Sequence, residues 1–255
     1  MIHFIDVSNH QGRAGMVLSK VLPSVGGVVC KATEGVGFVD AYCDPFVQTC
    51  RAAAKPWGFY HFAREASPKE EFAYFLNNTI NYFGEGIPVL DWEGDQSVSW
   101  VNEFVRGIHR ETGVWPWAYG NPWRFNQGGV EPNCMRWVAQ YPGITTFAQA
   151  EKSSPAATEG TVGAWQFTSK GLVNGYAGQL DCNLFYGDAA AWAAYVKGDN
   201  VSEDKTTITP EENAVYRLYN PNDGQHMFTA SVDEAQSLAD VGWVYEGIAF
   251  YAAEV

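Results

Sequence analysis

Two carboxylate residues, Asp91 and Glu93, directly follow an apolar run at residues 87–90. Side chains two positions apart on a β-strand point to the same face, with about 6–7 Å between their β-carbons. Such a pair suits glycoside hydrolysis, in which one carboxyl protonates the leaving oxygen and the other stabilises positive charge at the anomeric carbon. At about 6 Å and an effective dielectric near 20, the two charges repel by roughly 3 kcal/mol, or about two pKa units. One member is therefore expected to keep its proton toward neutral pH, more so if it is partly buried.

Two further acids, Asp6 and Asp181, lie at other apolar runs, in Ile-Asp-Val-Ser and Leu-Asp-Cys-Asn. A single acid at a strand end is more often a helix cap or turn residue, but four acids that converge on one barrel mouth favour a catalytic site. A divalent-metal site is a weaker alternative because no His accompanies the pair, and we expect neither a metal nor another cofactor. The chain also lacks a P-loop, a Rossmann glycine motif, HExxH and GxSxG, which argues against nucleotide-binding, zinc-protease and serine-hydrolase functions.

Short apolar, β-branched or aromatic runs alternate with helical patterns in the first 197 residues. A capping box with Pro at the first helical position, Ser67-Pro68-Lys69-Glu70, predicts a helix to about residue 82. Further helices are expected at residues 99–112, ended by Gly113, and at 44–54 and 188–196. We predict about eight strands, at residues 4–7, 28–32, 57–62, 88–92, 117–119, 136–140, 164–167 and 180–184.

Strands that alternate with helices indicate βα units and a parallel sheet, and eight of them suggest a barrel. Residues 121–135 and 142–162 are rich in Pro, Gly, Ser and Asn and show poor helical periodicity. The predicted fold is therefore α/β: an irregular, TIM-like β/α barrel of about eight strands, with few helices late in the chain.

Charge is distributed unevenly along the chain. The formal net charge of −13 argues against non-specific nucleic-acid binding and against charge-driven binding to anionic membranes. Residues 201–255 hold two basic and ten acidic side chains, a net charge of −8, whereas residues 1–200 carry −5. This shift, together with the polar composition of residues 198–213, predicts a catalytic barrel over 1–197, a linker over 198–213 and a small α+β module over 214–255.

The cysteines and the N-terminus give weaker information. The five cysteines are odd in number and form no CxxC pair, which argues against a zinc site or a disulfide framework, although a Cys43–Cys50 pair is left open. The N-terminus lacks the basic region of a signal peptide, and no stretch approaches the roughly 20 apolar residues of a membrane helix. We expect no membrane insertion, and either a protein made in the cytoplasm or a mature fragment.

Eight motifs occur in order along the first 195 residues. They are DVSNHQG at 6–12, KATEG at 31–35, GFYHF at 58–62, PVLDWE at 88–93, YGN at 119–121, WVAQY at 137–141, AWQF at 164–167 and LDCN at 180–183. Together they resemble glycoside hydrolase family 25, the Chalaropsis-type lysozymes that include phage endolysins. The resemblance implies an irregular β/α barrel that hydrolyses the β-1,4 bond from N-acetylmuramic acid to N-acetylglucosamine in bacterial peptidoglycan.

By position in these motifs, Glu93 matches the general acid and Asp91 its partner carboxylate, with Asp6 and Asp181 as flanking acids. The resemblance also implies net retention, with the substrate acetamido group as a candidate internal nucleophile that Asp91 orients. One departure is the YGN motif, where many relatives carry Tyr-Thr/Ser-Ser-like residues.

Several residues near predicted strand ends are candidates for sugar contacts. Aromatic rings there can stack on sugars, although barrel or rim packing is an equal alternative for each. A lysine can contact an acidic peptide stem or form a buried salt bridge, and His61 fits a hydrogen-bonded core residue better than a catalyst. The predicted substrate-binding residues are Tyr60, Lys31, Tyr119, Gln140, Tyr141 and Trp165.

The C-terminal region contains VYRLYNP at 215–221, HMFT at 226–229, GW at 242–243 and YEG at 245–247. These motifs resemble a repeat found beside bacterial and phage wall hydrolases. The region predicts a strand, a turn at residues 220–224, a helix capped by Ser231 with Glu234, and a helix end at Gly242. We expect a cell-wall-binding unit that is one part of a larger region, with a structural appendage as the alternative.

Alternatives for the whole chain are a chitinase-like hydrolase of related amino-sugar polymers and a non-catalytic wall-binding protein. The sequence fits a phage endolysin released through a holin pore, and it also fits a bacterial lysin secreted by another route. It leaves open the target bacterium and the oligomeric state.

Overall fold

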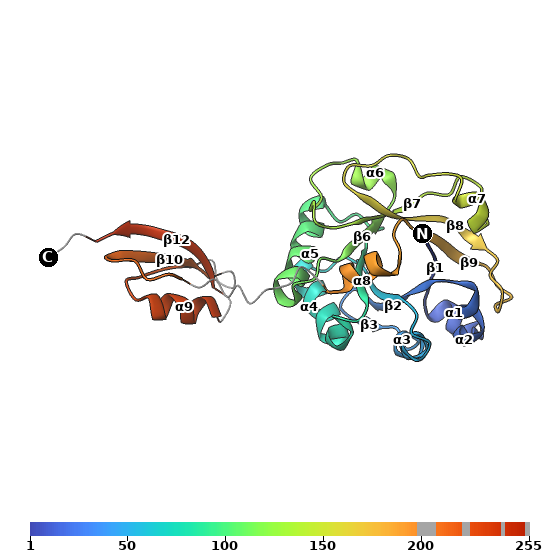
Figure 1. The fold of residues 1–255 in the computed structure, drawn as a ribbon, viewed down its shortest axis with the longest axis horizontal. Helices are drawn as coiled ribbons and strands as arrows, with labels where there is room; N and C mark the ends of the chain where they lie inside the picture. The colour runs from blue at the N-terminus through green and yellow to red at the C-terminus, as the bar shows by residue number, and fades with distance from the viewer. Residues whose placement is uncertain (198–207, 221–224, 241–242, 253–255) are drawn as a thin grey trace. The chain divides into compact units, whose positions relative to one another are not determined.

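The computed structural model describes residues 1–197, 208–220, 225–240 and 243–252 (Figure 1). The chain divides into two compact units with the boundary at residue 200. Among the described residues, no helix is both long enough and apolar enough to cross a membrane.

Eight strands of the first unit form a closed barrel. Each strand pairs with the next around the ring, and β1 closes it by pairing with both β2 and β9. A two-residue strand that the sequence analysis missed, β3 at Phe38–Val39, forms a hairpin with β2 outside the ring. The barrel strands are β1 Ile2–Val7, β2 Gly27–Glu34, β4 Trp57–Phe62, β5 Ile87–Asp91, β6 Trp117–Gly120, β7 Arg136–Ala139, β8 Val162–Gly171 and β9 Leu180–Phe185.

The predicted signals mark the start of α4 (Pro68–Thr79) and the end of α5 (Val98–Thr112). Ser67 accepts a hydrogen bond from the N–H of Glu70 in a complete capping box, and Gly113 ends α5 in the left-handed conformation with φ +71°. A 3-10 turn at Ile80–Tyr82 continues α4 to the predicted end. The helices of this unit are α1 Asn9–Arg13, α2 Leu18–Val21, α3 Cys43–Ala52, α4 Pro68–Thr79, α5 Val98–Thr112, α6 Pro122–Phe125, α7 Phe147–Ala150 and α8 Ala189–Lys197, with a 3-10 turn at Leu22–Ser24.

The barrel is mixed and not wholly parallel, which corrects the parallel sheet expected from the βα pattern. Neighbouring strands among β1, β2 and β4–β8 pair in the parallel direction. Strand β9 is antiparallel to both of its neighbours, β8 and β1. Because β9 runs the opposite way, its first residues lie at the same end of the barrel as the last residues of its neighbours. This direction determines where Asp181 lies.

Helix α8 packs at the end of the barrel where the parallel strands begin. Its Trp192 donates a hydrogen bond from Nε1 to the carbonyl of Trp57, the first residue of β4. The Trp192 ring makes edge contacts with Phe4, Trp117 and Phe185, which belong to the apolar cluster inside the barrel. The interior is thus filled from this end, and the opposite end is left for the site.

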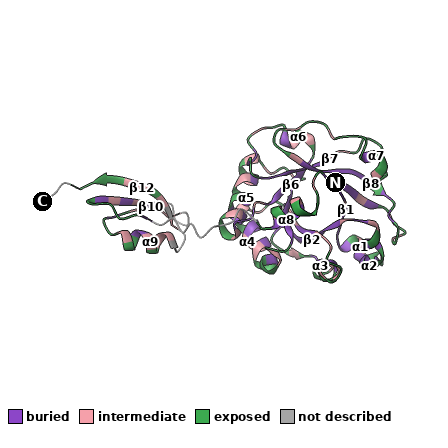
Figure 2. Cartoon of the chain, in the orientation of Figure 1, coloured by how far each residue is buried: buried purple, intermediate pink, exposed green. Residues whose placement is uncertain are grey.

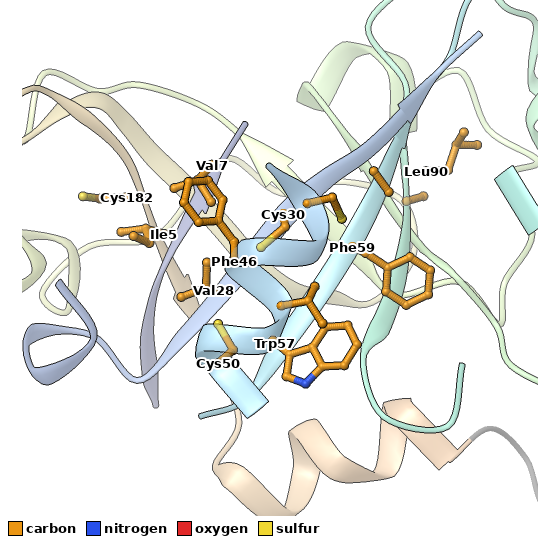
Figure 3. Packing of buried hydrophobic residues seen from close by; sticks show 14 of the residues in the cluster. Ile5, Val7, Val28, Cys30, Phe46, Cys50, Trp57, Phe59, Leu90 and Cys182 are labelled. Carbon is orange, nitrogen blue, oxygen red and sulfur yellow. The ribbon is translucent and has the colours of Figure 1, made fainter. Parts of the chain in front are cut away.

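A second apolar cluster packs the outer helices on the strands, so that the strands are buried while the helices expose their outer faces (Figure 2). In Figure 3, Phe46 and Cys50 of α3 lie close to Cys30 and Val28 of β2. All five cysteines are buried and free, which decides the open Cys43–Cys50 question. Seven residues along one helix separate these two by about 10.5 Å of rise, beyond the reach of a disulfide.

The second unit is a three-stranded antiparallel sheet with one helix. The strands β10 Ala214–Tyr219, β11 His226–Thr229 and β12 Val244–Tyr251 are ordered β11-β10-β12, and α9 spans Val232–Asp240. Ser231 caps α9 by accepting from the N–H of Glu234, whose carboxylate accepts from the hydroxyl of Thr229. Residues 221–224 of the predicted turn and Gly242 lie outside the described residues.

The core of this unit begins inside the predicted linker. Ile208 is buried in the same cluster as Tyr216, Leu218 and Ala235, and its N–H donates to the side chain of Gln236. Residues 208–213 therefore pack with the small sheet, and the rest of the predicted linker, 198–207, lies outside the described residues.

Candidate active site

All four predicted acids line one cleft at the barrel end opposite α8. The cleft has a volume of about 320 Å³, and its walls come from the carboxyl ends of the parallel strands and the start of β9. The structure thus brings together residues from the beginning, middle and end of the barrel sequence. The predicted residues on its walls are Asp6, Asp91, Glu93, Asp181, Lys31, Tyr60, Tyr119 and Tyr141.

Asp6 and Asp181 face each other across the β1–β9 pairing, where they are direct register partners. Asp6 Oδ2 accepts hydrogen bonds from Gln166 Nε2 at 2.9 Å and from Asn183 Nδ2 at 2.8 Å. The Asn183 side chain is itself oriented by Trp137, whose Nε1 donates to Asn183 Oδ1 at 2.9 Å. These bonds fix Asp6 in one orientation toward the cleft.

Asp91 and Glu93 differ sharply in their surroundings. Asp91 is the last residue of β5 and only 8% exposed, whereas Glu93 lies beyond the strand and is exposed. Trp92 between them is fully buried and donates from its Nε1 to the carbonyl of Gln96. Asp91 Oδ1 is buried and has no hydrogen-bond partner among the described residues. A buried oxygen of this kind in a cleft is a candidate contact for a substrate hydrogen-bonding group.

Burial and mutual repulsion raise the pKa values of the cleft acids. Burial, followed by the charge of Glu93, raises the pKa of Asp91 well above its usual value. Burial and the neighbouring charges of Asp6 and Glu93 raise the pKa of Asp181 to about 8. Burial also raises the pKa of Asp6, to about 6, against the lowering effect of its bonds from Asn183 and Gln166. The carboxyl of the Asp91–Glu93 pair whose burial favours retention of a proton is therefore Asp91.

The tyrosines form part of a polar network on one wall. Gln166 Oε1 accepts from the hydroxyl of Tyr119 at 2.8 Å and also from the hydroxyl of Tyr141. Tyr119 is buried, whereas Tyr141 is 52% exposed, so that its ring is accessible to a ligand. Lys31 is buried beside Phe62 and pairs with Glu34 at 2.5 Å, as in the salt-bridge alternative of the sequence analysis.

The structure does not bring two predicted substrate-binding residues into this cleft. Trp165 is fully buried, packs against Phe167 in the outer cluster and donates from Nε1 to the carbonyl of Gln140. Neither face of the Trp165 ring is therefore accessible for stacking on a sugar. Gln140 lines a second, adjacent pocket that shares Glu93 with the cleft.

Sequence analysis missed Gln166 and Asn183 as site residues. Both are polar and fully buried within apolar strands, and each lies on the strand face that turns toward the acids. The signal was present, because Asn183 is two residues from Asp181 and side chains repeat with period two along a strand. His61 is a core residue, as expected: its ring bonds Thr33 at 2.7 Å and Glu71 at 2.8 Å, and burial lowers its pKa.

A β/α barrel with a cleft of converging carboxyl groups is an arrangement suited to glycoside hydrolysis. The chain belongs to glycosyl hydrolases family 25, whose family model matches residues 5–176. Residues 180–255 match a family described as a domain of unknown function, DUF5648. That second match begins at β9, although the structure places β9 and α8 within the barrel.

Several known proteins similar to this chain carry lysozyme or endolysin names. The autolytic lysozyme of Clostridium acetobutylicum is 27% identical over 188 residues, which cover 71% of this chain and 55% of that protein. This chain thus spans about half the length of that relative. The structure of a bacterial lysozyme from Streptomyces coelicolor superposes with a TM-score of 0.66 at 26% identity, covering 77% of this chain and 97% of that one. The CTP1L endolysin gives a TM-score of 0.61 at 26% identity, covering 78% and 71%.

Proposed function

We propose that this protein is an N-acetylmuramidase, a lysozyme that hydrolyses the β-1,4 bond between N-acetylmuramic acid and N-acetylglucosamine in bacterial peptidoglycan. The observation that carries the proposal is the cleft itself, in which Asp6, Asp91, Glu93 and Asp181 converge and Asp91 Oδ1 has no partner among the described residues. Membership of family 25 supports the same substrate class.

In the proposed mechanism, Glu93 is the general acid and Asp91 is the partner carboxyl. Glu93 is exposed to the cleft and protonates the oxygen of the leaving sugar as the glycosidic bond breaks. Asp91, held rigidly at the end of β5, hydrogen-bonds the acetamido group of the substrate. The acetamido oxygen then attacks the anomeric carbon, and Asp91 in its ionised form stabilises the positive charge that develops. The burial that favours the proton on Asp91 in the resting site also strengthens the attraction between its carboxylate and a neighbouring cation. A water molecule gives its proton to the Glu93 carboxylate and completes hydrolysis with net retention.

Replacing Glu93 by Gln tests this function. The amide keeps the shape of the side chain but donates no acidic proton, so we expect turnover to fall by at least about a hundredfold. Asp91→Asn should also be severely impaired. Release of reducing ends from purified peptidoglycan measures the effect, with chitin as the comparison substrate and circular dichroism as the check on folding.

Each outcome of this experiment has a clear reading. Cleavage of peptidoglycan but not chitin by the wild-type protein supports the muramidase, and the reverse preference supports a chitinase-like enzyme. Binding to walls without any cleavage indicates a non-catalytic protein. A folded Glu93→Gln variant that lyses walls at the wild-type rate removes Glu93 from the mechanism.

We also propose that the second unit binds the bacterial cell wall and that the enzyme acts there, after release through a holin pore as a phage endolysin or after secretion by another route. The net charge of −8 over residues 201–255 favours aromatic and hydrogen-bonding contacts with glycan over attraction to anionic wall polymers.

A further inference from the structure

A second pocket adjoins the cleft on the far side of Glu93. It has a volume of about 250 Å³ and shares three residues, Glu93, Tyr119 and Tyr141, with the cleft. A group bound there lies next to the proposed proton donor and hence next to the scissile bond. The other walls come from Trp92, Asn121, Arg124, Ala139 and Gln140.

Arg124 is the cation of this pocket. The carboxylates of Asp95, Glu93 and Asp91 act on its charge from nearby, without a direct ion pair among the described residues. Its guanidinium lies over the ring of Trp92, with 5.3 Å to the centroid, and Nη2 donates to the backbone carbonyl of Glu93. Arg124 Nε is buried and has no hydrogen-bond partner, and no salt bridge joins Arg124 to any carboxylate in the described parts of the chain. Lys31, the cation of the main cleft, is by contrast already paired with Glu34.

Two amide side chains make the same pocket rich in donors. Asn121 Oδ1 accepts from the N–H of Arg124, and Gln140 Oε1 accepts from the N–H of Ala156 at 2.6 Å. Each carbonyl oxygen thus accepts one hydrogen bond that orients its side chain, and the amide N–H groups are the donors that each side chain offers to a ligand. A pocket with an unpaired guanidinium and two amide donors matches a ligand that carries a carboxylate.

We propose that the Arg124 pocket binds a carboxylate on the peptide stem of the muramyl sugar and so selects peptide-bearing glycan as the substrate. This selectivity rests on the proposed function, and it adds recognition of the stem carboxylate, which cleavage of the glycan does not by itself require. Lys31 in the main cleft is already paired with Glu34, so the guanidinium of the adjacent pocket is the better-placed group to hold a stem carboxylate close to the scissile bond. A polymer of N-acetylglucosamine alone offers this pocket no anion.

The test compares two soluble substrates with the same glycan. One is a muropeptide oligomer with free stem carboxylates, and the other is the same oligomer after its carboxylates are converted to amides. We expect the wild-type protein to prefer the free form by about tenfold in kcat/KM, as for a charge-assisted hydrogen bond. Arg124→Gln should lose this preference, and Arg124→Lys should retain part of it.

The ratio of the two kcat/KM values separates recognition from mere positioning of Glu93. If Arg124 only holds the Glu93 backbone, the variant loses activity equally on both substrates and the ratio stays at the wild-type value, which overturns the inference. Arg110→Gln, which removes an exposed arginine of α5 paired with Glu111, is the matched control and should keep the wild-type ratio. If the wild-type protein cleaves both substrates equally well, the pocket inference fails while the muramidase function stands. If it cleaves neither, the proposed function fails as well.

Discussion

At the residue scale, the cleft concentrates carboxyl groups at a cost in folded-state stability. Asp6 and Asp181 are direct partners across two strands, and Asp91 lies buried at the end of a third. Hydrogen bonds from Gln166 and Asn183 offset part of the cost at Asp6 only. Burial and mutual repulsion of carboxyl groups are typical of catalytic sites. Such groups destabilise the resting folded state but supply the charge that the transition state needs.

A pH dependence of stability follows from Asp181. Its pKa is raised from 3.8 to about 8, so the folded state holds a proton that the unfolded chain has already released between about pH 4 and pH 8. The barrel should therefore lose stability as pH rises through this window, by up to about 1.4 kcal/mol per pH unit for each such proton. Asp181→Asn cannot ionise and should flatten the decline.

Urea unfolding at pH 5 and pH 8 measures this effect. Tryptophan fluorescence reports on the barrel, since all tryptophans except Trp243 lie within it. Glu103→Gln, which removes an exposed carboxyl of α5, is the control. An equal decline in Asp181→Asn, Glu103→Gln and the wild-type protein would show that Asp181 does not hold the extra proton.

The four acids could be predicted from the sequence because each lies at or beside an apolar run, but the orientation of β8 could not. In Ala-Trp-Gln-Phe, the aromatic Trp165 suggests a sugar contact, whereas Gln166 is the residue that faces the acids. Neighbouring side chains on a strand point to opposite faces, and the sequence does not state which face is the cleft. The buried polar neighbour was the better indicator, because a buried amide requires polar partners.

At the element scale, strand positions were predictable and the direction of β9 was not. The predicted strand at 164–167 left twelve residues before 180, enough for a parallel crossover. The observed β8 continues to Gly171, which leaves only residues 172–179 and permits an antiparallel return. Because β9 runs antiparallel, Asp181 at its start lies at the cleft. The chain then reaches the opposite end of the barrel, where α8 packs against the interior.

Truncating the α8 anchor should destabilise the whole barrel. Trp192 is 2% exposed and contacts three strands, so Trp192→Ala should lower the free energy of unfolding by about 3–5 kcal/mol. Trp123, which is 68% exposed on α6, provides the matched control, and Trp123→Ala should change stability by less than about 0.5 kcal/mol. Thermal and urea unfolding of both variants measure the difference. Equal effects would mean that α8 does not belong to the barrel core.

At the scale of the whole molecule, the chain joins a barrel to a small unit with its own core. One face of the small sheet packs Tyr216 and Leu218 with α9, as the alternating burial along β10 requires. On the other face, Arg217 is the register partner of Phe228, and Val215 is that of Phe250. Phe228 and Phe250 are 52% and 55% exposed within the described structure, and exposed aromatic rings on a sheet are suited to stacking on sugars.

Deleting residues 201–255 tests whether this unit targets the wall. The deletion leaves all eight barrel strands and α8 intact, so cleavage of small soluble muropeptides should stay within about twofold of the full chain. Binding to intact cell walls should weaken by about tenfold or more in a sedimentation assay, because the exposed aromatic face is lost. Phe228→Ala with Phe250→Ala in the full chain should reproduce most of the binding loss, whereas Glu212→Gln, on an exposed residue before β10, should not. A truncated barrel that binds whole walls as tightly as the full chain would exclude the second unit as the targeting element.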